Sequence, residues 1–102
     1  MKLMASVLLK TPDHPQRTAT LLQSAVQSMI ERLERSLQLT RKNLETFEAK
    51  YQVPSAQCFQ TLTAEDLEGG DLEYVEWQGE YQFFLEIEQD LNILKSLEYV
   101  PQ

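Results

Sequence analysis

The sequence predicts an all-α protein: a long antiparallel helical hairpin with a short connecting helix, assembled as a dimer or larger bundle. Two long stretches carry apolar side chains at helical spacings, and the segment between them is rich in helix-capping and turn residues. The length of 102 residues fits one domain. We therefore expect a single helical-hairpin domain over residues 1–102.

The amino terminus predicts a short strand over residues 3–9. Its apolar run ends at Lys10-Thr11-Pro12-Asp13 with no small-residue cleavage site behind it, so we do not interpret it as a signal peptide. No stretch approaches the roughly 18 continuous apolar residues that a membrane-spanning helix needs. We expect a cytoplasmic protein with no membrane partner.

The first long helix is expected over residues 14–52. Asp13 and Gln16 can cap its free amides, Pro15 suits the first turn, and Val53-Pro54 ends it. Apolar or weakly polar side chains recur three or four positions apart and define one face: Leu22, Val26, Met29, Leu33, Leu37, Thr40, Leu44, Phe47 and Tyr51.

The connecting segment predicts a short helix over residues 55–62, capped by Ser55. A capping box at residues 63–66 follows, and Gly69-Gly70 ends that turn. Asp71 caps the second long helix, expected over residues 72–97, although its start also alternates like a strand. Residues 97–100 are a candidate strand partner for residues 3–9.

The second long helix has more than one apolar face. A core face, rich in aromatic residues, recurs at helical spacing: Tyr74, Trp77, Tyr81, Phe84, Ile87, Leu91 and Leu94. Leu72, Val75 and Phe83 point well away from it. The first helix would be roughly 58 Å long and the second roughly 39 Å. The hairpin therefore leaves apolar surface for a second molecule, either another copy or a different protein.

Composition excludes several kinds of chemistry. A single cysteine, Cys58, allows no internal disulfide and is expected to be a small hydrophobic residue on the short helix. A single histidine, His14, allows no Cys/His metal cluster. Three glycines, two of them adjacent, build no phosphate-binding loop. We expect no cofactor, no metal site and no catalytic residue.

Charge is divided unevenly along the chain, whose net charge is −7. Residues 1–53 carry eight basic and five acidic side chains, whereas residues 54–102 carry eleven acids against Lys95 alone. Arginines on the first helix are interleaved with glutamates, so we expect no direct contact with nucleic acid. The acidic carboxyl-terminal half favours a basic protein partner.

Two rows on the second helix are candidate binding residues. One is an acidic row formed by Glu73, Glu76 and Glu80. We interpret this row as a solvated face or as a docking surface for a basic partner, and a metal or acid/base site is a weaker alternative. Tyr74, Trp77 and Tyr81 either pack in the hairpin core or anchor a partner. Gly79 lies inside this helix, where glycine costs roughly 1 kcal/mol relative to alanine, and so indicates close approach of another group.

A resemblance covers about residues 44–97. Its pattern is Phe47-Glu48-Ala49-Lys50-Tyr51, then Ser55 and Phe59, then Gly70-Asp71, and last Glu76-Trp77-x-Gly79-x-Tyr81. The pattern resembles a group of small prokaryotic helical proteins, many of which are regarded as antitoxin-like partners of a second small protein. This resemblance implies a binding module and supplies no catalytic residue.

The sequence therefore favours a non-enzymatic protein-binding module, the acidic neutralising partner of a small basic, toxin-like protein. Its candidate partner-binding residues are Glu73, Tyr74, Glu76, Trp77, Glu80 and Tyr81. Two alternatives stay open: a stand-alone homo-oligomeric helical scaffold and, more weakly, a carboxylate-metal nucleotide hydrolase.

Overall fold

The computed structural model describes residues 5–10, 13–61 and 71–101, and most of them are helical. The elements follow in the order β1 (Ala5–Leu9), α1 (Pro15–Tyr51), α2 (Ser55–Thr61), α3 (Asp71–Lys95) and β2 (Leu97–Pro101). The predicted mostly helical architecture is confirmed, with both long helices ending within two residues of their expected bounds. Residues 72–77, which also alternate like a strand, are helical.

Both ends of α1 use a residue in the left-handed backbone region. His14 has a φ of 52°, and its carbonyl oxygen accepts the first helical bond from the Thr18 amide at 3.0 Å. Gln52 has a φ of 59° just after the last turn, a position where helices commonly end in this conformation. The Gln52 side-chain amide donates to the Ala49 carbonyl at 2.7 Å and satisfies one of the last free acceptors.

The chain divides into two compact units. Unit 1 comprises Met1–Arg35 and Glu88–Gln102, and unit 2 comprises Ser36–Ile87. Both contain part of α1 and part of α3. The assignment of residues 1–102 to one domain stays a prediction.

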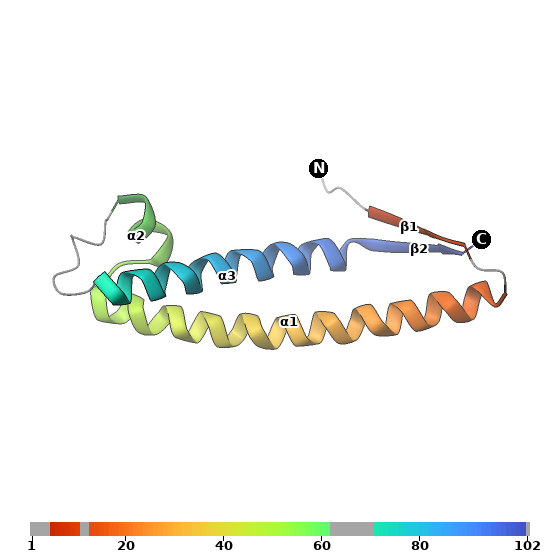
Figure 1. Ribbon diagram of the computed structural model, residues 1–102, viewed down its shortest axis with the longest axis horizontal. Coiled ribbons are helices and arrows are strands. Elements are labelled where there is room, and N and C mark those ends of the chain that lie inside the picture. The colour runs from red at the N-terminus through yellow and green to blue at the C-terminus, as the bar shows by residue number, and fades with distance from the viewer. Residues whose placement is uncertain (1–4, 11–12, 62–70, 102) are drawn as a thin grey trace. The chain divides into compact units, whose positions relative to one another are not determined.

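Unit 2 is an antiparallel helical hairpin closed by α2. Contacts run in opposite directions along the two long helices: the Arg41 guanidinium lies over the Phe84 ring, and Phe47 stacks on Trp77. Figure 1 shows α2 beside the end of α1 and the start of α3. Leu44, Cys58 and Trp77, one from each helix, form the buried centre of the unit. Cys58, expected as a small hydrophobic residue on the short helix, lies on α2 and is fully buried in this centre.

Unit 1 corrects part of the predicted face of α1. Ala19 and Ile30 are its buried positions, and Leu91 is buried on α3, whereas Met29 is 45% exposed and Leu22 is also exposed. Met29 and Ile30 are neighbours and both apolar, so spacing alone did not decide which one turns inward. An ion pair between Lys95 and Glu34, 2.9 Å long and exposed, joins the two helices in this unit.

The terminal strands pair in parallel. The register places Ala5 beside Leu97 and Leu9 beside Pro101. Parallel strands need a long crossover connection, which the helices between them supply here. Residues 3–4 of the expected first strand lie outside the described residues, as does the predicted capping turn at residues 63–70. Asp71, expected as a cap, is already the first residue of α3.

The burial pattern of unit 1 makes a prediction that separates two adjacent residues. Ile30→Ala should lower the free energy of unfolding by about 2–5 kcal/mol, because it deletes a side chain that is only 8% exposed. Met29→Ala should change it by no more than about 0.5 kcal/mol. Urea denaturation followed by far-UV circular dichroism measures both, and equal losses would contradict the orientation of α1 described here.

Candidate protein-binding surface

The interior of unit 2 is organised around Trp77, whose side chain is 0% exposed. Phe47 and Tyr51, one turn apart on α1, each stack on the indole with ring centroids 5.6 Å away. Phe59 of α2 meets it edge-on at 5.5 Å. Because the indole is enclosed by rings of its own chain, we assign Trp77 to the core and not to the predicted partner contact.

The indole nitrogen has a polar partner inside this enclosure. Trp77 Nε1 donates to Ser55 Oγ at 2.8 Å, and Ser55 Oγ donates in turn to Glu48 Oε2 at 2.8 Å. The Ser55 backbone amide donates to the same carboxylate oxygen at 2.7 Å. Ser55, predicted as a helix cap, thus links a carboxylate on α1 to an indole on α3. Spacing gave no signal for Glu48, because contacts between helices do not follow from positions along one helix.

Tyr74 and Tyr81 occupy the edge of the same cluster and are half-buried. Phe59 meets Tyr74 edge-on and stacks on Tyr81, with both centroid distances 5.4 Å. These two candidate binding residues therefore have a packing role within the chain. Contact of their exposed edges with a partner stays a prediction.

Glu73, the first member of the predicted acidic row, is already neutralised within unit 2. Its carboxylate accepts from Lys50 Nζ at 2.5 Å and from the Tyr51 hydroxyl at 2.7 Å. The hydrogen bonds from Lys50 and then Tyr51 lower the pKa of Glu73. Bonding to Glu73 raises the pKa of Lys50 and of Tyr51. Glu73 thus differs from Glu76 and Glu80, which make no ion pair among the described residues.

The outward side of α3 carries a row that we call the α3 apolar face: Leu72, Val75, Gly79 and Phe83. These residues follow at spacings of three or four, so they share one side of the helix. Leu72 is 77% exposed, Val75 64% and Phe83 50%. The prediction that Leu72, Val75 and Phe83 point away from the core is confirmed.

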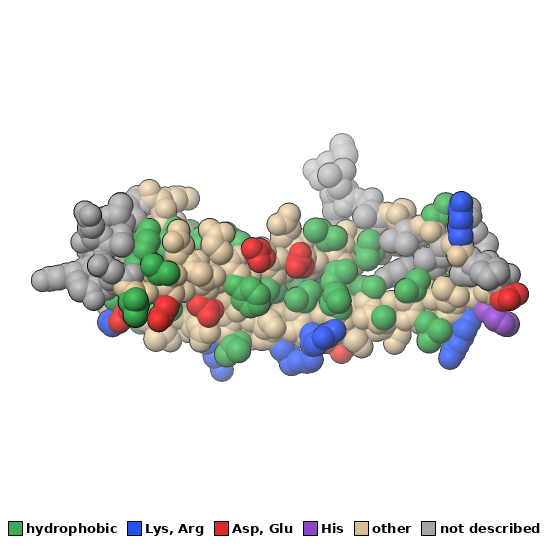
Figure 2. All heavy atoms as spheres, viewed as in Figure 1, with side chains coloured by type: hydrophobic (Ala, Val, Ile, Leu, Met, Phe, Trp, Pro, Cys, Tyr) green, Lys and Arg blue, Asp and Glu red, His purple; other side chains and the backbone are tan. Residues whose placement is uncertain are grey.

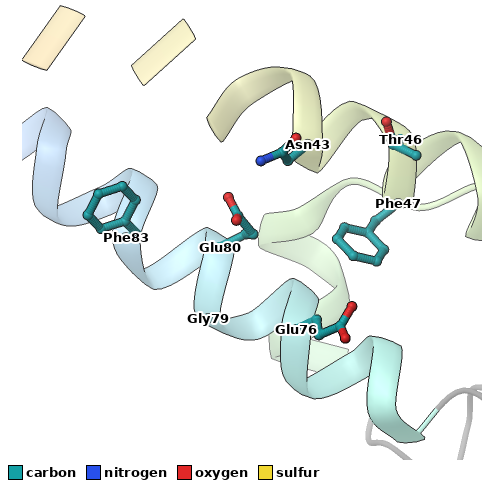
Figure 3. A pocket seen from close by; sticks show the side chains of 7 residues that line it. All are labelled: Asn43, Thr46, Phe47, Glu76, Gly79, Glu80 and Phe83. Carbon is teal, nitrogen blue, oxygen red and sulfur yellow. The ribbon is translucent and has the colours of Figure 1, made fainter. Parts of the chain in front are cut away.

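Beside this face lies an open groove of about 660 Å³, which we call the Gly79 groove. Its lining comes from both long helices: Asn43, Thr46 and Phe47 of α1, and Glu76, Gly79, Glu80 and Phe83 of α3. Figure 3 shows the Phe47 ring turned from α1 toward α3, and the Glu80 carboxylate extended toward Asn43. Figure 2 shows hydrophobic side chains gathered along the line where α1 and α3 meet. The groove combines an apolar floor with carboxylates along one wall.

Gly79 is central to this groove, and a Cβ built there meets nothing within 4 Å. The glycine therefore serves no close approach among the described residues. The close approach that the sequence suggests at Gly79 stays a prediction for a second molecule.

Acidic side chains, His14 and Cys58 are the candidate metal-ligating and nucleophilic groups among the residues that the structure describes. No group of three or more His, Cys, Asp or Glu side chains comes together there in a way that could hold a metal ion. Burial raises the pKa of the Cys58 thiol, which disfavours the reactive thiolate. No described helix has the length and apolar character to cross a bilayer.

Comparisons with known proteins leave the surface to be interpreted from its own geometry. No protein-family model, curated protein or solved structure matches the chain.

The six predicted binding residues fall into three groups. Glu76 and Glu80 line the groove, and Tyr74 and Tyr81 lie at the edge of the core. Glu73 is paired with Lys50, and Trp77 is enclosed in the core. The sequence interpretation did not identify Asn43 and Thr46 as lining residues, because they are polar residues on the other helix.

The enclosure of Trp77 predicts a large loss of stability on truncation. Trp77→Ala should lower the free energy of unfolding by about 3–5 kcal/mol, because it leaves a cavity among three rings. Trp77→Phe should cost less, since it retains a ring but leaves Ser55 Oγ without its donor. Chemical denaturation followed by far-UV circular dichroism suits both variants, which lack the chain's single tryptophan. An alanine variant as stable as the wild type would show that the indole is not a core residue.

The Glu73 cluster predicts a pH-dependent contribution to stability. The lowered pKa of Glu73 means that its contribution is present above the unfolded pKa of about 4.3 and is lost as the pH falls through the folded pKa. The raised pKa of Lys50 means that its contribution to stability also ends at alkaline pH. This contribution is present below about pH 10.4, the unfolded pKa, and is lost as the pH rises through the folded pKa.

Glu73→Gln should therefore lower the urea midpoint at pH 7, while keeping an oxygen that accepts from Tyr51. The difference from the wild type should shrink as the pH falls below the unfolded pKa of about 4.3 and should be lost as the pH passes the lowered folded pKa of Glu73. Glu86→Gln is the matched control, because Glu86 is exposed on the same helix and makes no ion pair among the described residues. A difference for Glu73→Gln that is independent of pH would contradict the role of charge.

Proposed function

We propose that this chain is a non-enzymatic protein-binding module whose α3 apolar face docks on a basic protein. The observation that carries the proposal is the exposure of Leu72, Val75 and Phe83 in one row on a helix whose opposite side is already packed. Contiguous apolar surface of this kind is typical of interaction sites on soluble proteins. Exposed apolar side chains that lie on one face contribute little to the isolated fold and gain free energy only when a partner covers them.

The charge of the same surface supports a basic partner. Glu76 and Glu80 border the groove without an ion pair among the described residues, and α3 carries one basic residue, Lys95, in unit 1. Like charges across an interface cost free energy, whereas opposite charges speed association and fix orientation. We propose that the partner is a small basic, toxin-like protein that this chain neutralises by covering its surface. The resemblance of residues 44–97 to antitoxin-like proteins supports the same function.

A homo-oligomeric scaffold is the second candidate. Unit 1 also exposes apolar residues, among them Leu21, Met29 and Ile93, which self-association would cover. A scaffold of this kind forms a stable oligomer and captures no other protein. The carboxylate-metal hydrolase stays the weaker alternative, and the described residues bring together no group of three or more His, Cys, Asp or Glu side chains that could hold a metal ion.

The proposal predicts that partner capture depends on Phe83 and not on the core. Tagged wild-type protein, expressed in its native cell, should co-purify with a basic polypeptide identified by mass spectrometry. Phe83→Asn should reduce that capture at least about tenfold, because it removes a large apolar contact at an interface. The free energy of unfolding should fall by only about 1 kcal/mol, since half of the Phe83 side chain is already exposed.

Leu85→Asn is the matched control. Leu85 is also an exposed apolar residue of α3, but it lies off the α3 apolar face and outside the lining of the groove. Its substitution should leave capture unchanged. Equal loss of capture in both variants, or a stable oligomer that captures nothing, would overturn the proposed function.

A further inference from the structure

We propose that the element seated in the Gly79 groove is a cationic amphipathic helix, which crosses α3 at Gly79. This inference rests on the proposed function and specifies the partner's chemistry at the same surface. Three features carry it: the length of the α3 apolar face beside the groove, the absence of a side chain at Gly79, and the carboxylates on the groove wall that make no ion pair among the described residues.

The dimensions fit a helix. The α3 apolar face extends from Leu72 to Phe83, about 16 Å at 1.5 Å per residue, and its part from Gly79 to Phe83 belongs to the groove lining. Its exposed members are spaced as the anchors of a helix-in-groove contact are. Phe47 provides an apolar floor between α1 and α3, and Phe83 lies at the opposite end of the lining from Glu76. A helix of three or more turns covers this length with one apolar side.

Gly79 allows a backbone to approach closely at the centre of this face. A Cβ at this position would point into open space, so the glycine relieves no crowding among the described residues. Inside a helix, glycine is disfavoured relative to alanine, and its general use is to let another backbone come near. Neighbouring positions on the face carry Val75 and Phe83, which would contact the crossing helix on both sides of the glycine.

The wall of the groove selects for positive charge. Glu76 and Glu80 lie one helical turn apart, and neither has an ion pair among the described residues. Lys50, which belongs to the same unit, is already bound to Glu73. Lysine or arginine side chains flanking the apolar side of an incoming helix would supply the missing partners, whereas an acidic helix would be repelled.

A second copy of this chain fits the groove less well. Its α3 would bring more carboxylates, because the helix carries Lys95 as its single basic residue. Its α1 exposes Leu39 in unit 2 and Leu21, Leu22 and Met29 in unit 1. The arginines of this helix are interleaved with glutamates, so it presents no uniformly basic flank beside its apolar residues. The partner's helix must instead combine several apolar anchors with basic flanks.

The test uses two synthetic helical peptides of about 18 residues, about five turns. Both have leucines at spacings of three and four; one has lysine at the remaining positions and the other has glutamate. Binding to the full chain is measured by calorimetry, and oligomeric state by analytical ultracentrifugation. We expect the lysine peptide to bind, with an affinity that falls as salt is added, and the glutamate peptide not to bind.

Gly79→Ala gives the most specific result, because it should strengthen the fold while it weakens binding. Alanine favours the helix, so the melting temperature should rise by roughly 3–8 °C. The added methyl group should lower the affinity for the lysine peptide at least about tenfold by blocking close approach of its backbone. Gln78→Ala, exposed on the same helix but outside the groove lining, should leave that affinity unchanged.

The charge of the wall is tested separately. The double variant Glu76→Gln and Glu80→Gln should lose at least about fivefold in affinity, because both carboxylates of the groove are neutralised. Glu45→Gln with Glu88→Gln is the matched control, since it removes the same charge outside the groove lining. Equal losses in the two double variants would show unspecific attraction and overturn the inference.

The two proposals fail in different ways. Absence of peptide binding, unchanged affinity in Gly79→Ala, or self-association that depends on Gly79 would overturn the cationic helix as occupant. The proposed function would survive any of these results if Phe83→Asn still abolished capture of the native partner. Peptide binding with the expected variant effects supports the cationic helix.

Discussion

The fold of unit 2 depends on the burial of one large amphipathic side chain. Trp77 places its ring among Phe47, Tyr51 and Phe59 while its nitrogen donates to Ser55. A buried N–H without an acceptor would cost free energy, so the ring and the hydrogen bond have to be satisfied together. The bond from Ser55 to Glu48 extends this requirement across all three helices.

This inward arrangement determines what α3 presents on its other side. With Trp77 directed inward, Gly79 and Phe83 necessarily occupy a different side of the helix, because residues two and six positions away do not share its face. Figure 3 shows the consequence at the groove, where Glu76, Glu80 and Phe83 lie around the glycine. Glu73, which shares the acidic row in sequence, is instead drawn into a contact with Lys50 and Tyr51. One helix thus combines an aromatic core with an unpartnered outer face.

Periodicity predicted the elements well, because helix boundaries and apolar spacing depend on neighbours along the chain. The bounds of α1, the burial of Ile87 and Leu91, and the exposure of Leu72 all follow from such local rules. Contacts between helices are harder to predict from the sequence. The choice of Ile30 over Met29 depends on a small rotation of α1, and the link from Ser55 to Glu48 depends on how α2 folds back. Because such contacts do not follow from spacing, the sequence left open whether Trp77 packs in the core or contacts a partner.

Several features of the α3 apolar face and of the adjoining groove wall oppose the stability of the isolated chain. A helix-interior glycine at an open position costs roughly 1 kcal/mol relative to alanine. Glu76 and Glu80, like charges one turn apart, cost a few tenths of a kcal/mol more. Exposed Val75 and Phe83 bury little area in return. Local choices that weaken a fold tend to occur at functional sites, where a second requirement has to be met. Glu76, Gly79, Glu80 and Phe83 coincide in a single groove, next to an aromatic core that obeys the ordinary rules of packing. This coincidence is the reason why we propose α3 as the binding element.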